Sequence, residues 1–208
     1  MSYIHKITNE LFNSNTYFYV VDGKCIVIDP GSDYEKIKSY IISNNLSILL
    51  ILATHGHFDH VSSASLLKKE FDCKFCMHKN DTKILKMANF LMKMFGYNQN
   101  IEIPLVDNYL EGNEGLLEYQ NINIAFFLFP GHTSGSCFFE IENNLFTGDT
   151  LFYSTDISKI PNDSIELLRL SQKSIFEKFN ENLFFWPGHG NGGPLKEIKN
   201  YLIKKNIL

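Results

Sequence analysis

The fold is decided by the stretch Thr54-His55-Gly56-His57-Phe58-Asp59-His60, which places three histidines and an aspartate within six positions. It follows the apolar run Ser47–Ala53, which has the length and composition of a buried strand. Alternate residues of an extended segment point in the same direction. We therefore expect His55 and His57 to bind one metal ion together.

The second half of this stretch predicts a second metal position. Gly56 lets the backbone turn tightly, and the turn brings Asp59 and His60 toward that position. Imidazole and carboxylate groups are ligands of zinc, iron and manganese. Burying four such groups without a metal ion would cost on the order of several kcal/mol. A metal site is therefore favoured over a purely structural role.

Three later loops each place one ligand-type residue after an apolar strand and a glycine. They are Phe129–Gly135 with His132, Phe146–Thr150 with Asp149, and Trp186–Gly190 with His189. Loops at strand ends are common places for binding residues. Together with the first stretch, these residues complete a ligand set for two metal ions.

Strands and helices alternate along the rest of the chain. Strands are expected at 16–21, 25–29, 47–53, 73–77, 122–129, 136–141, 145–147 and 183–186, and helices at about 33–43, 61–71, 81–95, 164–179 and 194–205. The turn Asp22-Gly23 predicts a hairpin between the first two strands. Residues 96–115 are expected to be irregular. Hairpins and crossovers in one chain predict an α/β sandwich with sheets inside and helices outside.

Composition argues against several functional classes. The 208-residue chain has a formal net charge of −4, whereas proteins that bind nucleic acid usually carry a basic surface. Residues 1–10 lack the apolar run of a signal peptide, and no stretch approaches the roughly 20 apolar residues that cross a bilayer. We expect a cytoplasmic monomer or homodimer that acts on a small molecule, without a nucleic-acid or membrane partner.

As a set, these motifs resemble the metallo-β-lactamase superfamily, and within it the short bacterial glyoxalase II-like hydrolases. The resemblance runs from Asn15-Thr16-Tyr17 and Asp29-Pro30-Gly31 to Pro187-Gly188-His189-Gly190. It implies an αββα four-layer sandwich of two mixed sheets flanked by helices, in a single domain over residues 1–208. It also implies that the C-terminal glutathione-binding helical domain of full-length glyoxalase II is lacking.

The resemblance implies a role for each ligand-type residue. His55, His57 and His132 would bind the first metal ion, Asp59, His60 and His189 the second, and Asp149 would bridge the two. Zinc is the expected metal, with iron and manganese as alternatives. A hydroxide between the metal ions would attack a carbonyl carbon. Asp59 would orient that nucleophile and is the expected catalytic residue.

The expected substrate is a thioester of the S-lactoylglutathione type, because the short glyoxalase II-like proteins match this chain in length. Asp149 argues against a true β-lactamase, which usually lacks an aspartate at the bridging position. A lactone hydrolase remains an alternative because it would use the same ligands. A persulfide dioxygenase with one iron is a second alternative, although His60 and His189 together favour a two-metal hydrolase.

Three residues beyond the bridging aspartate are candidates for substrate binding. Phe152 and Tyr153 follow Asp149 closely, and one of them is expected to form a wall of the pocket. Lys159 lies near the place where a lysine of the family would meet a glutathione carboxylate.

Overall fold

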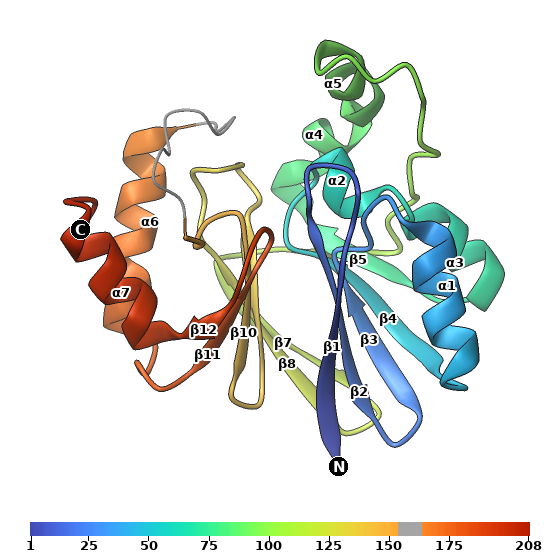
Figure 1. Cartoon of the computed structure of the whole chain (residues 1–208), viewed down its shortest axis with the longest axis horizontal. Coiled ribbons are helices and arrows are strands. Elements are labelled where there is room, and N and C mark those ends of the chain that lie inside the picture. Colours follow the sequence, from blue (N-terminus) through green and yellow to red (C-terminus); the bar gives the residue numbers. More distant parts are fainter. Residues whose placement is uncertain (154–163) are drawn as a thin grey trace. The chain divides into compact units, whose positions relative to one another are not determined.

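The computed structural model describes residues 1–153 and 164–208. The chain divides into two compact units, Met1–Leu110 and Glu111–Leu208 (Figure 1). Each unit contains one six-stranded sheet with both parallel and antiparallel neighbours. The two mixed sheets expected from the sequence are therefore present, one in each unit.

The first unit has a sheet in which the strands follow one another in chain order. Their bounds are β1 Ser2–Thr8, β2 Asn15–Val21, β3 Lys24–Ile28, β4 Ser47–Ala53, β5 Phe75–His78 and β6 Asn108–Leu110. Strands β1 to β3 are antiparallel, and β3 to β6 are parallel. The predicted hairpin turn between β2 and β3 is confirmed, with positive φ at both Asp22 and Gly23.

Helices cover one face of this first sheet. Their bounds are α1 Tyr34–Ser43, α2 Phe58–Val61, α3 Ala64–Phe71, the 3₁₀ turn η1 Lys79–Asp81, α4 Thr82–Lys86 and α5 Ala88–Met94. Ile37 and Ile41 of α1 and Leu67 of α3 pack in one buried cluster with Val27 and Ile51 of the sheet. This packing holds the carboxyl end of β4, where the histidine-rich stretch begins.

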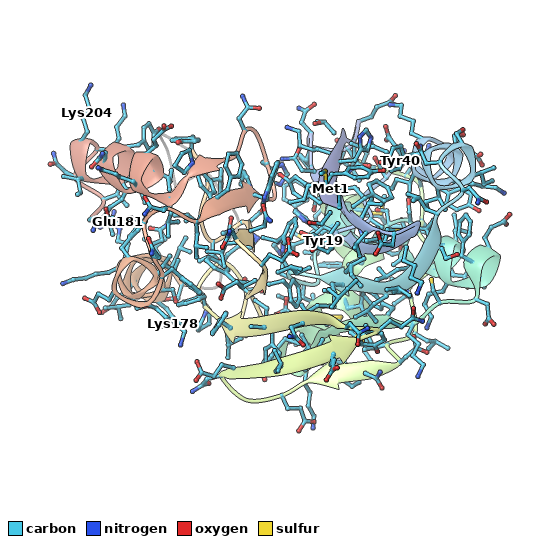
Figure 2. All side chains as sticks on the ribbon, turned by 90° about the horizontal axis from the view of Figure 1, so that it is seen from below. Met1, Tyr19, Tyr40, Lys178, Glu181 and Lys204 are labelled. Atoms are coloured by element: carbon cyan, nitrogen blue, oxygen red, sulfur yellow. The ribbon has the colours of Figure 1, made fainter. Side chains whose placement is uncertain are left out.

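The second unit has the sheet order β12-β11-β10-β9-β8-β7. The bounds are β7 Glu114–Tyr119, β8 Ile122–Leu128, β9 Cys137–Ile141, β10 Asn144–Gly148, α6 Ile165–Lys178, β11 Phe184–Pro187, β12 Gly193–Pro194 and α7 Leu195–Lys204. Ile175 of α6 and Ile198 of α7 pack with Phe138 and Phe185 of the sheet. Lys204 projects outward at the end of α7 (Figure 2), whereas the Lys178 ammonium group at the end of α6 lies 4.7 Å from the centroid of the Phe127 ring of β8. The flanking helices expected from the sequence are therefore present in this unit as well.

Two predicted helices are interrupted. The helix expected at 61–71 starts at Phe58 and breaks before Ala64, because the N–H of Ser63 donates to Pro30 rather than along the helix. The helix expected at 81–95 breaks at Met87, whose N–H is shared between the carbonyls of Lys83 and Ile84. Such three-centre bonds tighten a helix end and favour a change of direction.

Four of the described strands, β1, β6, β7 and β12, were not predicted from the sequence. The edge strand β1 is only half-buried and carries polar residues, so its pattern is weak. The prediction that segment 96–115 is irregular is wrong in part, since the segment contains β6 and the start of β7. Strand β6 is only three residues long, too short for a periodic signal. No helix within residues 1–153 and 164–208 is long and apolar enough to cross a membrane.

Candidate metal centre

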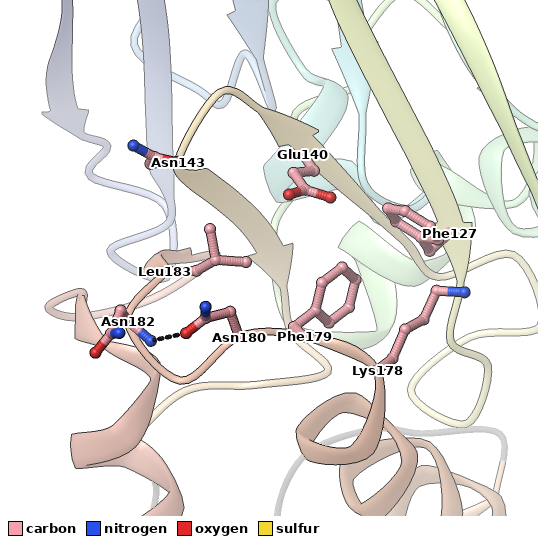
Figure 3. A pocket seen from close by; sticks show the side chains of 8 residues that line it. All are labelled: Phe127, Glu140, Asn143, Lys178, Phe179, Asn180, Asn182 and Leu183. Atoms are coloured by element: carbon pink, nitrogen blue, oxygen red, sulfur yellow. Dashed lines mark hydrogen bonds between the residues drawn. The ribbon is translucent and has the colours of Figure 1, made fainter.

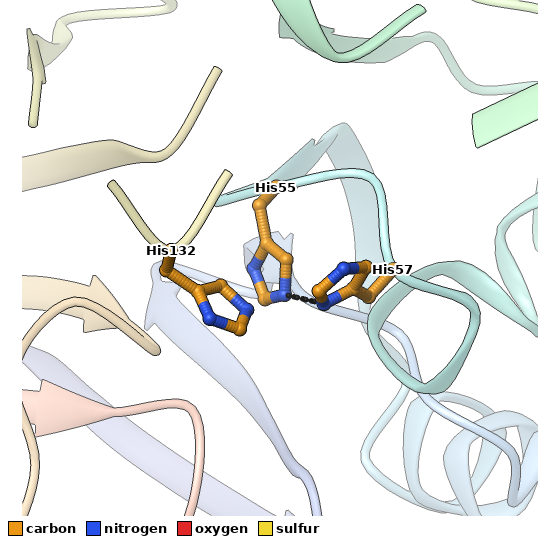
Figure 4. A group of neighbouring side chains, drawn as sticks. All are labelled: His55, His57 and His132. Atoms are coloured by element: carbon orange, nitrogen blue, oxygen red, sulfur yellow. Dashed lines mark hydrogen bonds between the residues drawn. The ribbon is translucent and has the colours of Figure 1, made fainter. Parts of the chain in front are cut away.

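The first pair of ligand-type residues lies in the loop that follows β4. His55 Nε2 and His57 Nδ1 are 3.1 Å apart, as the dashed line in Figure 4 marks. Two donor atoms that are each about 2.0–2.1 Å from a tetrahedral zinc ion lie roughly 3.3 Å apart. The spacing of these two nitrogen atoms therefore fits one shared metal ion, as the alternation of the sequence predicts.

The second pair lies at the start of α2 rather than in the loop where it was expected. Asp59 and His60 are both buried, and Asp59 Oδ2 is 3.4 Å from His60 Nε2. Because consecutive residues of a helix point in different directions, it is the first helical turn that sets the positions of these two side chains. Their donor atoms are again as close as two ligands of one metal ion would be.

A buried carboxylate orients both pairs and was not identified from the sequence. Asp29 Oδ2 is 3.0 Å from His60 Nδ1 and accepts a 2.7 Å hydrogen bond from the Thr54 hydroxyl. That hydroxyl is 3.1 Å from His55 Nδ1. Since the Thr54 proton is given to Asp29, the hydroxyl oxygen accepts from His55. Both histidines thus carry their proton on Nδ1 and present Nε2 as the donor atom to a metal ion.

A second acidic residue supports the loop from the other side. The buried Asp81 accepts a 2.8 Å hydrogen bond from the Gly56 N–H. A Cβ atom at position 56 would lie 3.1 Å from the Asp81 carbonyl oxygen and 3.1 Å from the Leu85 nitrogen. The glycine is therefore needed for close approach of the neighbouring backbone. Neither Asp29 nor Asp81 belongs to a motif of ligand-type residues. The only feature of the sequence that could have indicated their supporting role is that each follows an apolar run.

The second unit brings its three ligand-type residues together. Asp149 Oδ2 is 3.5 Å from His132 Nε2 and 3.2 Å from His189 Nε2. His132 and Asp149 are buried, and the His189 side chain is 22% exposed. One carboxylate oxygen thus lies beside one histidine from each of the two expected metal ligand sets. This position fits the bridging role that the resemblance implies for Asp149.

The donor set of each unit fits divalent metal ions. All seven side chains are imidazoles or carboxylates, the donors that zinc, iron and manganese accept. Within each unit the donor atoms approach to 3.1–3.5 Å. The Nδ1 protons of His55 and His60 are directed away from these contacts, toward Thr54 and Asp29. The donor types, their spacing and these hydrogen bonds therefore fit the binding of a divalent metal ion.

The candidate substrate-binding residues have different surroundings. The Phe152 ring centroid is 6.2 Å from that of His189, so this side chain adjoins a ligand-type residue. Tyr153 instead packs against Phe185 and Tyr201, with centroids 5.6 and 5.1 Å away, and burial raises the pKa of its hydroxyl. Lys159 lies outside the described residues. Phe152 is therefore better placed than Tyr153 to contact a substrate.

Comparison with known proteins connects this arrangement with a family. The sequence model of the metallo-beta-lactamase superfamily matches residues 9–189. The probable metallo-hydrolase MJ0888 of Methanocaldococcus jannaschii is 31% identical over 201 residues, which cover 91% of this chain and 94% of the relative. The hydroxyacylglutathione hydrolase GloC of Haemophilus influenzae is 30% identical over 169 residues, which cover 79% of each protein.

A solved structure extends the comparison to three dimensions. The crystal structure of TTHA1623 in a di-iron-bound form has a TM-score of 0.78 and 25% sequence identity, and the match covers 92% of this chain and 95% of that one. Together with the match to the family model, it confirms the predicted fold class, an αββα sandwich of two mixed sheets flanked by helices.

Proposed function

The chain belongs to the metallo-beta-lactamase superfamily, and from this membership we propose that its seven ligand-type residues hold two metal ions in one hydrolytic site. His55, His57 and His132 bind the first ion, Asp59, His60 and His189 the second, and Asp149 bridges them. The observation that carries this proposal is the position of Asp149 Oδ2, 3.5 Å from His132 Nε2 and 3.2 Å from His189 Nε2.

The reaction we propose is attack of water on a carbonyl carbon. When bound, the metal ions would supply Lewis acidity, which makes a water molecule easier to deprotonate and a carbonyl oxygen easier to polarise. Asp59 orients the attacking water by accepting a hydrogen bond from it. Asp29 keeps His55 and His60 in the tautomer that directs Nε2 toward the site. No serine or cysteine nucleophile is needed.

The substrate we propose is a thioester of the S-lactoylglutathione type. The similarity to the hydroxyacylglutathione hydrolase GloC, at 30% identity, supports this choice. Phe152 forms a wall of the substrate pocket because its ring adjoins His189. Zinc is the proposed metal by ligand chemistry, and the di-iron form of TTHA1623 supports iron as the alternative.

The test is a substrate panel measured on the purified protein with zinc or iron supplied. We expect hydrolysis of S-lactoylglutathione, measured through the thiol that it releases. A lactone, a β-lactam and a phosphodiester should not be hydrolysed at a comparable rate. An Asp149→Ala variant serves as the inactive reference. Activity confined to lactones would refute the thioester assignment. Oxygen consumption with glutathione persulfide, without thioester hydrolysis, would identify a dioxygenase instead.

A further inference from the structure

Four aromatic rings gather beside the metal-binding stretch of the first unit. The Phe12 ring centroid is 5.7 Å from Phe58, 5.4 Å from Phe95 and 5.7 Å from Tyr97. Phe58 and Phe95 are 6.0 Å apart. We call these four residues the aromatic cluster. Edge-to-face and tilted pairs at such distances are favourable, so the four rings form one packed group.

The aromatic cluster is connected to the metal-binding stretch in two ways: one of its residues belongs to that stretch, and a hydrogen bond joins the Phe12 loop to it. Phe58 stands between the ligand-type residues His57 and Asp59. The loop that carries Phe12 is attached through Ser14, whose hydroxyl donates a 2.8 Å hydrogen bond to the Asp59 carbonyl oxygen. A group held by the aromatic cluster would therefore lie next to the residues proposed to perform the hydrolysis.

Phe12 lies in the turn of the β1–β2 hairpin, which is closed by a 3.2 Å hydrogen bond from the Ser14 N–H to the Leu11 carbonyl oxygen. Phe12 and Asn13 both have a φ of 54°, in the left-handed region that bulky side chains rarely adopt. The loop is closed by a 2.8 Å hydrogen bond from the Asn9 N–H to the Ser14 carbonyl oxygen. Positive φ at both central residues is what such a hairpin turn requires, so the turn itself holds the Phe12 ring beside Phe58.

The aromatic cluster has a rigid base and an accessible rim. Phe58 is buried, whereas Phe12 is 40%, Phe95 47% and Tyr97 37% exposed. Helix α5 ends at Met94, and the Tyr97 N–H donates a 2.9 Å hydrogen bond to the Met92 carbonyl oxygen. This helix end directs Phe95 and Tyr97 back toward Phe12. Exposed aromatic surface on a fixed base is typical of a site for an apolar ligand group.

We propose that the aromatic cluster binds an apolar group where a thioester carries one, so that such a thioester is turned over faster than S-lactoylglutathione, which carries none. This inference rests on the proposed hydrolase function and narrows its substrate class. The apolar group belongs either to the acyl part or to the thiol part, and the two sources share the same aliphatic or aromatic chemistry.

Two series of thioesters test the proposal and separate the two sources. One keeps N-acetylcysteamine as the thiol and lengthens the acyl chain from acetyl to octanoyl, and the other keeps acetyl and lengthens an alkyl thiol. In the series that lengthens the group held by the aromatic cluster, we expect kcat/KM to rise by up to about fourfold for each methylene that becomes buried. The series that shows this rise identifies the source of the apolar group. Phe95→Ala and Tyr97→Ala should flatten this rise while changing the rate of the shortest substrate by less than about twofold. Tyr97→Phe should keep the rise.

Phe90→Ala is the matched control, since Phe90 lies on the same helix α5 and is 57% exposed but makes no ring contact with the aromatic cluster among the described residues. It should leave the dependence on chain length unchanged. Turnover of thioesters with no dependence on chain length in either series would overturn the proposal and leave the hydrolase function standing. A change of association state in the cluster variants, without a change in selectivity, would also overturn it and identify an interface between chains.

If no thioester is turned over, the proposed function fails. A binding measurement then shows whether the aromatic cluster binds apolar groups. S-alkyl-N-acetylcysteamine thioethers cannot be hydrolysed and carry the same chains. Tighter binding of longer thioethers by the natural protein, lost in Phe95→Ala but kept in Phe90→Ala, would support an apolar site. Equal affinity for all chain lengths would refute it.

Discussion

The Asp29 carboxylate lies 3.0 Å from Nδ1 of His60, and both side chains are fully buried. A buried charge of this kind is stable only when hydrogen-bonded, and the Thr54 N–H and hydroxyl satisfy it, each at 2.7 Å. The result is that His60 and, through Thr54, His55 present Nε2 to the site. Asp29 is thus a positioning residue for two of the proposed ligands.

Asp29→Asn should weaken metal binding by about 10- to 100-fold, the usual effect of losing such a supporting partner. The amide that replaces Oδ2 would donate where His60 and Thr54 need an acceptor. Affinity is measured by competition with a chelator of known strength. Asp22→Asn is the control, because Asp22 lies in the exposed β2–β3 turn at a positive φ that asparagine tolerates. Equal affinity in both variants would contradict the positioning role.

Asp149→Ala should lose at least one metal ion and nearly all hydrolysis. The substitution removes the oxygen that adjoins both His132 and His189. Metal content and kcat/KM are measured on the same preparation, and far-ultraviolet circular dichroism checks that the variant is folded. A variant that retains two metal ions and the normal rate would rule out the bridging role.

Gly131→Ala should be strongly destabilising, by about 3 kcal/mol, since overpacking against a backbone cannot be relieved by a side-chain shift. A Cβ atom there would lie 2.2 Å from the nitrogen of Leu168 in α6. Gly190→Ala is the matched control. Gly190 also has a positive φ, 75°, but no described atom lies within 4 Å of the position that its Cβ would take. It should cost only about 1–2 kcal/mol. Urea unfolding compares the two, and equal losses would contradict the predicted contact.

Glu140→Gln should raise stability at neutral pH. Glu140 lines a hollow of about 580 Å³ in the second unit with Phe127, Phe179 and Lys178 (Figure 3). Burial raises the pKa of its carboxyl, and Lys178 offsets this only in part. The unfolded chain therefore loses this proton first, and stability falls as pH rises from about 4.3 through the raised folded pKa.

The measurement is the free energy of unfolding in urea at pH 4 and pH 7. The advantage of Glu140→Gln over the natural protein should appear at pH 7 and vanish below the ordinary pKa of glutamate. Glu118→Gln, on an exposed residue of β7, is the control and should show no such difference. An advantage of the same size at both pH values would exclude the titration of Glu140 as its cause.

The sequence was most informative where an apolar run of strand length is followed directly by ligand-type residues. The apolar run at Ser47–Ala53 predicted β4 with the correct bounds, and the histidines after it predicted the ligand-bearing segment, although the expected loop at residues 54–60 gives way to helix α2 from Phe58. The sequence analysis noted Asp29 only as part of a motif and did not predict its role, because that role depends on His60, which is distant in sequence and adjacent only after β3 and β4 pair. The left-handed backbone at Phe12 has no sequence signal, since its loop contains no glycine.

The most direct test of the two-metal site is the metal content of the protein, purified without chelator or affinity tag and measured by mass spectrometry of the elements. The proposed ligand set predicts about two metal ions per chain, as zinc or as mixed zinc and iron. A single iron per chain, with no second ion taken up when zinc or iron is added, would contradict the dinuclear hydrolase and favour the mononuclear dioxygenase.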